Sequence, residues 1–315
     1  MDKKEKFLSL LGEIEPRINT YSKYLNSKML SKIIRSLIVR EKSFLKVLAI
    51  LMKNILGIDF KKKIKTFWGR DLYVYLADAD ASALFFFSTL YGDEIKIIKF
   101  LIKNFKENDI FYDVGANYGF YTCLAQEFIT EGEIHAFEPN PKIFRLLKEN
   151  SRLDIFKNTF LNEVALSDKT GETEFYDREV NRHSGGSSLI KHPHFKRYKT
   201  IKVKTITLAE YVLDHKPPTI MKIDVEGGEP FVLKGALKLL QECSPTIVIE
   251  FIPDDLHREA IDILLNNGYE IFRLDNDGNL VSVNKRDLIQ RNITHEANYV
   301  FKKLNRNENL PNYKK

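Results

Sequence analysis

The sequence has few of the residues that mark specialised protein classes. Its two cysteines, Cys123 and Cys243, form no Cys-x-x-Cys pair, so neither a disulfide framework nor a cysteine zinc site is indicated. Fifteen glycines and ten prolines in 315 residues exclude collagen-like and low-complexity chains. No apolar run reaches the roughly 18 residues that span a bilayer, and no secretory signal follows Met1. We therefore expect a cytoplasmic protein, with peripheral contact to a membrane left open.

Positive charge is concentrated at one end of the chain. Residues 1–70 hold 17 Lys and Arg against 6 Asp and Glu, whereas the remainder holds 32 against 37. Apolar residues recur at helical spacing over residues 7–57, which predicts two or three amphipathic helices. The most apolar stretch is 44–58. We favour packing of this stretch onto the rest of the chain, and leave open an anionic membrane surface or a protein partner.

From about residue 106 the pattern is typical of an α/β fold. Short apolar runs that end in an acid alternate with helical periods, which predicts a parallel sheet. The runs are 110–113, 133–138, 219–224 and 246–250, and the connecting helices are 120–128, 141–151 and 231–242. Further strand-like runs are 160–166, 173–176 and 200–206, with a closing antiparallel pair at 269–274 and 298–301. We divide the chain into a basic helical extension (1–70), a helical linking segment (71–105), the main domain (106–303) and a polar tail (304–315).

A glycine loop between a predicted strand and a helix is the strongest local signal. Gly115 and Gly119 follow Asp113, and glycine allows a ligand to approach the backbone closely. The spacing Gly-x-x-x-Gly differs from the dinucleotide and ATP patterns, and an acid before the first glycine suits a cationic ligand better than a phosphate. Glu138 ends the next strand, where a carboxylate can accept both ribose hydroxyls. Adenosine together with an amino acid describes S-adenosylmethionine.

Several strings in this order give the chain a family resemblance. Asp113-Val-Gly-Ala-Asn-Tyr-Gly-Phe-Tyr-Thr122, Phe137-Glu-Pro-Asn140, Asn162-Glu-Val-Ala-Leu-Ser-Asp168, Ser184-Gly-Gly-Ser-Ser-Leu189 and Met221-Lys-Ile-Asp-Val-Glu-Gly-Gly-Glu229 resemble the FkbM-type family of S-adenosylmethionine-dependent methyltransferases. The resemblance covers roughly residues 90–302. It implies a class I (Rossmann-like) sheet of seven strands with the last antiparallel, and O-methylation of a sugar, glycan or small metabolite.

The resemblance also implies where the cofactor binds. The methionine end is expected along the glycine loop, the ribose at Glu138 and Pro139, and the adenine edge near Glu163, Val164 and Ala165. The loop residues in this prediction are Asp113, Gly115, Ala116, Asn117, Gly119 and Phe120, and Asp224 is expected to reach the cofactor from a neighbouring strand.

The acid-rich string after the fourth run supplies candidates for catalysis. A hydroxyl acceptor needs a positioned base, and we predict Asp224 as base or acceptor clamp, with Glu226 second. Glu229 is interpreted as a first-turn charge that opposes the helix dipole. The loop 183–188 is predicted as a lid whose His183 is an alternative base.

The sequence also offers candidates for an acceptor contact and for a metal site. Tyr91 or Glu94 is a hypothesis for an acceptor contact. A divalent cation on Asp224, Glu226 and Glu250 is left open but not favoured, and zinc is not indicated because no histidine pair has the required helical spacing.

Two other functions remain open from the sequence. An RNA methyltransferase could use the basic N-terminus to hold phosphates, although the main domain is net acidic and lacks an Asn-Pro-Pro-Tyr-like tetrad. A non-catalytic cofactor-binding or interaction protein is the other alternative, and the presence of Asp113, Glu138 and Asp224 argues against it.

Overall fold

The computed structural model describes residues 1–25, 40–178, 183–191, 198–251, 255–283 and 297–303. Residues 26–39 of the predicted amphipathic stretch and the polar tail at 304–315 lie outside the described residues.

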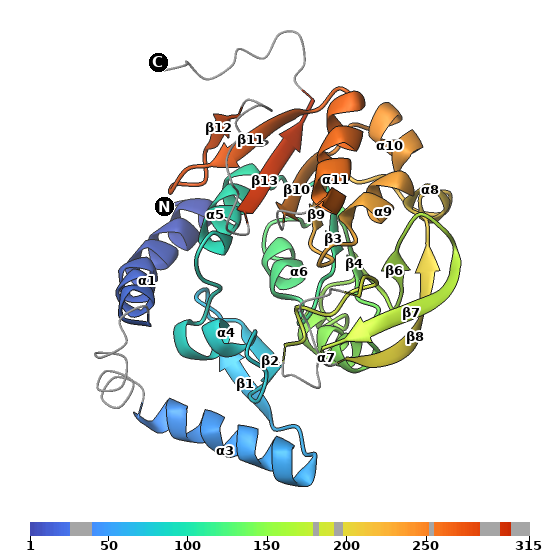
Figure 1. Ribbon diagram of the computed structural model, residues 1–315. Helices are drawn as coiled ribbons and strands as arrows, with labels where there is room; N and C mark the ends of the chain where they lie inside the picture. The colour runs from blue at the N-terminus through green and yellow to red at the C-terminus, as the bar shows by residue number, and fades with distance from the viewer. Residues whose placement is uncertain (26–39, 179–182, 192–197, 252–254, 284–296, 304–315) are drawn as a thin grey trace.

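A large mixed sheet forms the centre of the described chain (Figure 1). Its eight strands are ordered β12 (Leu280–Ser282), β11 (Glu270–Leu274), β13 (Ala297–Lys302), β10 (Thr246–Phe251), β9 (Ile220–Ile223), β3 (Ile110–Val114), β4 (Glu133–Phe137) and β5 (Thr159–Asn162). Strands β10, β9, β3, β4 and β5 are parallel, and β13 runs antiparallel to both β10 and β11. The α/β class and the reversed strand are confirmed, and β12 extends the sheet beyond the seven expected strands.

Helices cover both faces of this sheet. On one face lie α1 (Lys3–Leu25), α5 (Glu94–Asn104), α6 (Phe120–Ala125) and α7 (Pro141–Ser151), and on the other lie α8 (Leu208–Tyr211), α9 (Glu229–Lys234), α10 (Leu237–Glu242) and α11 (Asp255–Asn266). The start of α7 follows from its sequence, because the Asn140 side chain caps the helix and Pro141 occupies its first turn. Phe7 and Leu11 of α1 are buried in the core of the first face, so the N-terminal helix packs against the main domain.

The prediction of a helical extension over residues 1–70 is wrong for residues 61–70. After α3 (Arg40–Leu56) the chain forms an antiparallel hairpin of β1 (Lys61–Lys65) and β2 (Asp71–Tyr75), so the expected boundary at residues 70 and 71 falls inside one unit. Alternate side chains such as Ile64, Leu72 and Val74 are buried, which is the period of a strand. A short helix, α4 (Ser82–Phe87), follows the hairpin.

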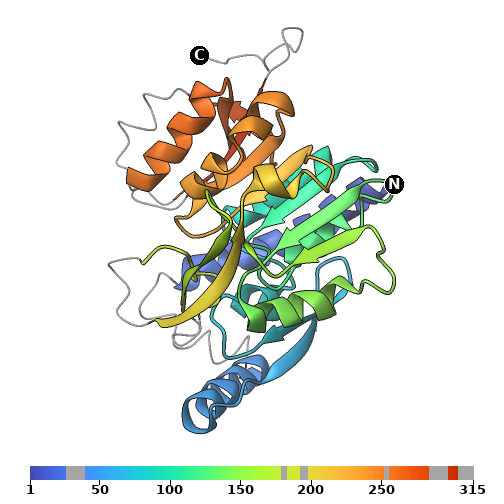
Figure 2. The same cartoon turned by 90° about the vertical axis from the view of Figure 1, so that its right-hand side faces the viewer.

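Two other predicted elements are divided. The run at 160–166 ends as β5 at Asn162, and Ala165 starts a separate three-stranded sheet of β6 (Ala165–Leu166), β8 (Lys199–Ile206) and β7 (Gly171–Asp177). The helix expected at 231–242 is split into α9 and α10 at Gly235, where a Cβ would lie 2.1 Å from the Ser167 carbonyl oxygen. Gly235 thus lies against the residue that follows β6 of the small sheet, which Figure 2 shows beside the main sheet.

None of the described helices combines the length and apolar character needed to cross a membrane.

Candidate active site

The carboxyl ends of three neighbouring strands meet at one edge of the large sheet. After β3 the chain continues to β4 and β5 on one side, and it later returns to β9 on the other side. Such a reversal of strand order is where ligands bind in open α/β sheets. The glycine loop after β3, Glu138 after β4 and Asp224 after β9 therefore face one region.

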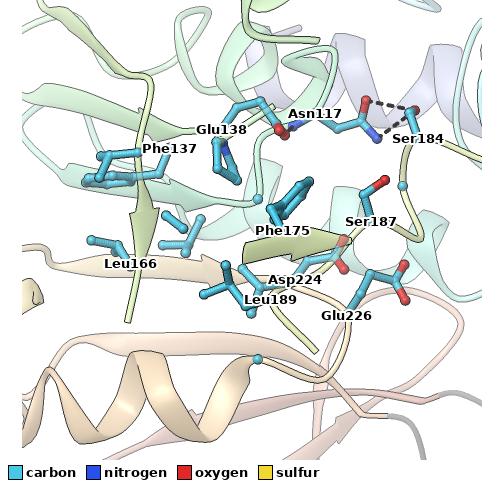
Figure 3. Close-up of a pocket in the computed structure, with 18 residues that line it drawn as sticks. Asn117, Phe137, Glu138, Leu166, Phe175, Ser184, Ser187, Leu189, Asp224 and Glu226 are labelled. Carbon is cyan, nitrogen blue, oxygen red and sulfur yellow. Dashed lines mark hydrogen bonds between the residues drawn. The ribbon is translucent and has the colours of Figure 1, made fainter. Parts of the chain in front are cut away.

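A narrow cavity of about 100 Å³ lies at this edge (Figure 3). Phe137 and Leu166 lie toward one end of it, and Asp224 and Glu226 lie toward the other. It is lined by Val114, Gly115, Asn117, Phe137, Glu138, Pro139, Val164, Ala165, Leu166, Phe175, Ser184, Gly185, Ser187, Leu189, Asp224, Val225, Glu226 and Gly228. A ligand with an apolar ring at one end and charged groups at the other fits this distribution.

The glycine loop passes directly against the backbone after β9. Gly115 has φ +83°, and a Cβ on it would lie 1.8 Å from the Asp224 carbonyl oxygen. The Asp224 N–H in turn donates to the Val114 carbonyl oxygen at 3.0 Å. Only glycine permits this approach, which brings the Asp224 side chain next to the loop.

Glu138 is buried at the edge of the narrow cavity and anchors the loop. Its Oε2 accepts from the Asn117 N–H at 3.0 Å and its Oε1 from the Asn140 N–H at 2.8 Å. Burial raises the pKa of Glu138 to about 7, although both N–H groups oppose the shift. Because each carboxylate oxygen has a second lone pair, Glu138 can still accept two hydroxyl groups of a diol.

Asp224 belongs to a cluster of charged side chains that the sequence does not reveal. The Lys222 Nζ lies 2.6 Å from the Asp224 Oδ2, and Lys222 is 4% exposed. Burial by itself raises the pKa of Asp224, but the charge of Lys222 and a hydrogen bond from Glu250 outweigh it and lower that pKa. The charge of Asp224, together with burial, raises the pKa of Glu250 to about 11. At neutral pH, Glu250 therefore carries a proton and Asp224 is ionised.

A wider cavity of about 430 Å³ adjoins the narrow one and shares Gly115, Asn117, Gly185, Asp224 and Glu226 with it. Its other lining residues are Asp80, Ala83, Leu84, Leu90, Tyr91, Gly92, Asp93, Glu94, Ala116, Tyr118, Phe120, Tyr121, Lys222, Glu250 and Asn298. Among the described residues that line this cavity, six are acidic and one, Lys222, is basic. The two cavities share Asp224, and the ionised acids of the wider one disfavour anions even though Glu250 is protonated.

A short strap, residues 183–188, lines the cavities between the glycine loop and the segment of Asp78 and Asp80. The buried Asp78 Oδ1 accepts from the Ser184 N–H at 3.3 Å, and the Asp80 Oδ2 accepts from the Gly185 N–H at 2.8 Å. From the glycine loop, the Asn117 Nδ2 donates to the Ser184 Oγ at 3.3 Å. The strap is thus held by residues about 105 and 67 positions away in the sequence.

Glu229 has a structural role in addition to the predicted one. It is 1% exposed, and its Oε1 accepts from the backbone N–H groups of Val225 and Gly227 at 3.1 and 3.2 Å. Its Oε2 lies 3.1 Å from the Nε2 of His257 in α11. These contacts hold the turn in which Glu226 adopts φ +54°. Glu229 lies in the first turn of α9, as expected, and its buried carboxylate also shapes the turn before the helix.

The structure brings most of the predicted cofactor residues to the cavities. Gly115, Asn117, Glu138, Pro139, Val164, Ala165 and Asp224 line the narrow cavity, and Ala116 and Phe120 line the wide one. Asp113, Gly119 and Glu163 line neither cavity. Asp113 is buried behind the loop, where it accepts from the Thr122 Oγ1 at 2.6 Å and its Oδ1 has no hydrogen-bond partner, whereas Glu163 is exposed.

Of the predicted catalytic residues, some line the cavities and one does not. Asp224 and Glu226 line both cavities, whereas His183 lines neither and lies 3.3 Å from the Asp80 Oδ1. Tyr91, Glu94 and Glu250 line the wide cavity. Within the described part of the chain, no three Asp, Glu, His or Cys side chains are grouped so as to hold a metal ion.

Sequence reasoning missed Lys222 and the acids of the N-terminal segment. The signal for Lys222 is its spacing, because it lies two residues before Asp224 and alternate residues of a strand share a face. No comparable signal identifies Asp78 and Asp80, since they reach the strap only through tertiary contacts.

Comparison with known proteins assigns a family. A family model described as "Methyltransferase FkbM domain" matches residues 113–271. The hexuronic acid methyltransferase AglP of Haloferax volcanii is 32% identical over 158 residues, which cover 49% of this chain and 61% of that protein. The methyltransferase sdnD of Sordaria araneosa is 25% identical over 235 residues, which cover 64% of this chain and 88% of that protein. The match thus spans less than two thirds of the Haloferax protein.

Solved structures of methyltransferases are more distant. A methyltransferase FkbM from Methylobacillus flagellatus KT is 14% identical with a TM-score of 0.40, and the match covers 71% of this chain and 55% of that one. An O-methyltransferase from Thermotoga maritima is 13% identical with a TM-score of 0.39, and the match covers 79% of each chain. Structural similarity this low gives no information about the residues of the site.

Proposed function

The chain belongs to the FkbM family of S-adenosylmethionine-dependent methyltransferases, and from this premise we propose that it methylates a hydroxyl group of an uncharged sugar or related polyol. The observation that carries this proposal is the pair of cavities that meet at Asp224. The narrow cavity suits the cofactor and the wide cavity suits the acceptor.

The residues of the narrow cavity fit S-adenosylmethionine. Val164, Ala165 and Leu166 offer an apolar surface to the adenine ring, and Glu138 offers two acceptor oxygens to the ribose hydroxyls. The loop from Gly115 to Asn117 is left for the methionine end. When bound, the cofactor supplies an electrophilic methyl group on a positively charged sulfur.

Asp224 is the residue we assign to the acceptor hydroxyl. It is ionised at neutral pH because Lys222 and protonated Glu250 stabilise its charge. The carboxylate accepts a hydrogen bond from the hydroxyl, orients the oxygen lone pair, and takes the proton as the new carbon–oxygen bond forms. Glu226 remains the second candidate for this role.

The acidic wide cavity argues for an uncharged acceptor. Asp80, Asp93 and Glu226 line it in addition to Asp224, and like charges at a few ångströms repel. A hexuronate or a phosphate backbone is therefore disfavoured. Several N-terminal lysines are also engaged within the chain, since Lys3 pairs with Glu127 and Lys61 with Glu149, which weakens the RNA alternative.

A panel of acceptors tests the proposal. Purified protein is incubated with isotopically labelled S-adenosylmethionine and, separately, with neutral hexose glycosides, hexuronates and a structured RNA, and products are followed by mass shift. We expect labelled methyl ethers from the neutral sugars. Preferential labelling of the hexuronate or of the RNA would contradict an uncharged acceptor, and failure to bind the cofactor by calorimetry would contradict the whole proposal.

The affinity for S-adenosylmethionine is expected to fall as the pH drops below about 7. The pKa of Glu138 is raised to about 7 by burial, and the ribose hydroxyls donate to its ionised form. Protonation therefore competes with binding, and the dissociation constant approaches a tenfold rise per pH unit below that value. Calorimetric titrations at about pH 6 and about pH 8 measure the effect.

Two variants make this pH test specific. Glu138→Gln is expected to bind at least about tenfold more weakly at the higher pH, because hydrogen bonds to a charged acceptor are lost, and its affinity is expected to vary little with pH. Glu163→Gln is the matched control, since Glu163 is an exposed acid that lines neither cavity. Equal affinity of the wild-type protein at both pH values would refute the assignment of Glu138 to the ribose.

A further inference from the structure

One face of α3 is fixed to the rest of the molecule. Ala49 is 1% exposed, and the Lys46 Nζ donates to the Asp78 carbonyl oxygen at 3.0 Å and to the Ser82 Oγ. Near its end, Lys53 pairs with Asp59 at 2.7 Å. Figure 1 shows α3 at the bottom of the molecule beside β1 and α4. These contacts determine which face of the helix points away from the protein.

The outward face of α3 is apolar. Phe44, Val47, Leu48, Leu51 and Ile55 are 67, 54, 40, 49 and 74% exposed. Their spacing of three or four residues aligns them on one side of the helix, and we call them the apolar stripe. The exposed Leu56, Ile58 and Phe60 continue the apolar surface beyond it. The sequence-based prediction that this stretch packs onto the chain is therefore wrong for this face.

The charges around the apolar stripe are positive. Residues 44–58 contain Lys46 and Lys53 and no acid, and residues 40–65 contain eight Lys and Arg against two Asp and Glu. Asp59 lies between two cations, Lys53 and Lys142. On the adjoining hairpin, Asp71 likewise pairs with both Lys63 and Lys65. Each of these acids pairs with two cations, so each group keeps a net charge of +1.

We propose that α3 lies in the surface of an anionic lipid bilayer, with the apolar stripe among the acyl chains. An exposed apolar helix face in a segment of net positive charge is typical of interfacial helices, because the hydrocarbon removes the stripe from water and the positive segment favours anionic headgroups. The occupant is a lipid surface because the stripe itself is purely hydrocarbon and the net charge of residues 40–65 is positive. This inference does not depend on the proposed methyl transfer.

The attachment of α3 also sets where the wide cavity lies. Lys46 holds the segment of Asp78 and Ser82, and Asp80 and Ala83 in that segment line the wide cavity. A helix in the bilayer surface therefore brings the proposed acceptor cavity close to the membrane.

Vesicle co-sedimentation of the full-length protein tests the proposal. The probes are vesicles of phosphatidylcholine alone and of phosphatidylcholine mixed with phosphatidylglycerol. We expect the wild-type protein to sediment with the anionic vesicles and only weakly with the neutral ones. The double variant Leu51→Glu/Ile55→Glu is expected to lose at least about tenfold in partitioning, since each side chain no longer enters hydrocarbon.

Matched substitutions separate the stripe from a general loss of apolar surface. Leu213 and Leu237 are also exposed, at 78 and 42%, but lie outside α3, so Leu213→Glu/Leu237→Glu is expected to sediment like the wild type. Calorimetric binding of S-adenosylmethionine is expected to be the same in all three proteins, which shows that the fold is intact and keeps this test apart from the proposed function.

Three results would overturn the membrane proposal. The wild-type protein could stay in the supernatant with anionic vesicles, or the stripe variant could sediment as well as the wild type. Light scattering could instead reveal a wild-type dimer that the stripe variant converts to a monomer, which would assign the stripe to a second copy of the chain.

Discussion

Asp224→Asn is expected to keep its affinity for S-adenosylmethionine and to lose turnover by about a hundredfold or more, the usual range for removal of a positioned base. The amide has nearly the shape of the carboxylate, so the backbone contact with Gly115 is retained. It cannot take a proton, and it no longer neutralises Lys222, which lies 2.6 Å away. Single-turnover rates with the acceptor found in the panel, together with calorimetric cofactor binding, measure the two quantities separately.

Two companion variants determine which carboxyl group is the base. Glu250 already carries a proton because Asp224 raises its pKa to about 11, so Glu250→Gln imitates its native state and is expected to retain most of the turnover. Glu226→Gln tests the second candidate. Full turnover in Asp224→Asn, with a large loss in Glu226→Gln or Glu250→Gln, would move the role away from Asp224.

Gly115→Ala is expected to abolish measurable binding of S-adenosylmethionine and to destabilise the fold. A side chain at φ +83° already costs about 1–2 kcal/mol. The new Cβ would also lie 1.8 Å from the Asp224 carbonyl oxygen, and this oxygen cannot move aside easily because the Asp224 N–H bonds to Val114. The loop must therefore shift away from the point where the two cavities meet.

Gly69→Ala provides the control for backbone strain alone. Gly69 has φ +91°, and nothing lies within 4 Å of the added Cβ. Its variant is expected to lose only about 1–2 kcal/mol in the free energy of unfolding, with unchanged cofactor affinity. Denaturant unfolding and calorimetry of both variants decide the point. If Gly115→Ala lost no more stability and no more cofactor affinity than Gly69→Ala, the close approach to Asp224 would not be needed for binding.

Sequence reasoning located the site better than it described its chemistry. Glu138 and Asp224 were predicted because each ends an apolar run, and the carboxyl ends of parallel strands share one edge. The position of Glu229 in the first turn of α9 was predicted, but its burial was not, because that depends on His257 of α11. His183 was predicted as a base from its loop, but the side chain lies beside Asp80 outside both cavities.

The N-terminal part shows the same limit. The apolar spacing of residues 44–55 predicts an amphipathic helix, and α3 confirms the helix. The spacing alone cannot decide whether its apolar face is covered. That depends on Lys46 and Ala49, which place the opposite face against the protein.

The sequence by itself determined the α/β class, the reversed strand β13, the glycine loop and the family. These depend on local periodicity and on short strings, which neighbouring residues specify. Only the tertiary structure decided which carboxyl groups are ionised, how residues 183–188 are held and which face of α3 meets solvent. Protonation and exposure depend on burial and on charges from distant segments, such as Glu250 beside Asp224 and Asp80 beside Gly185.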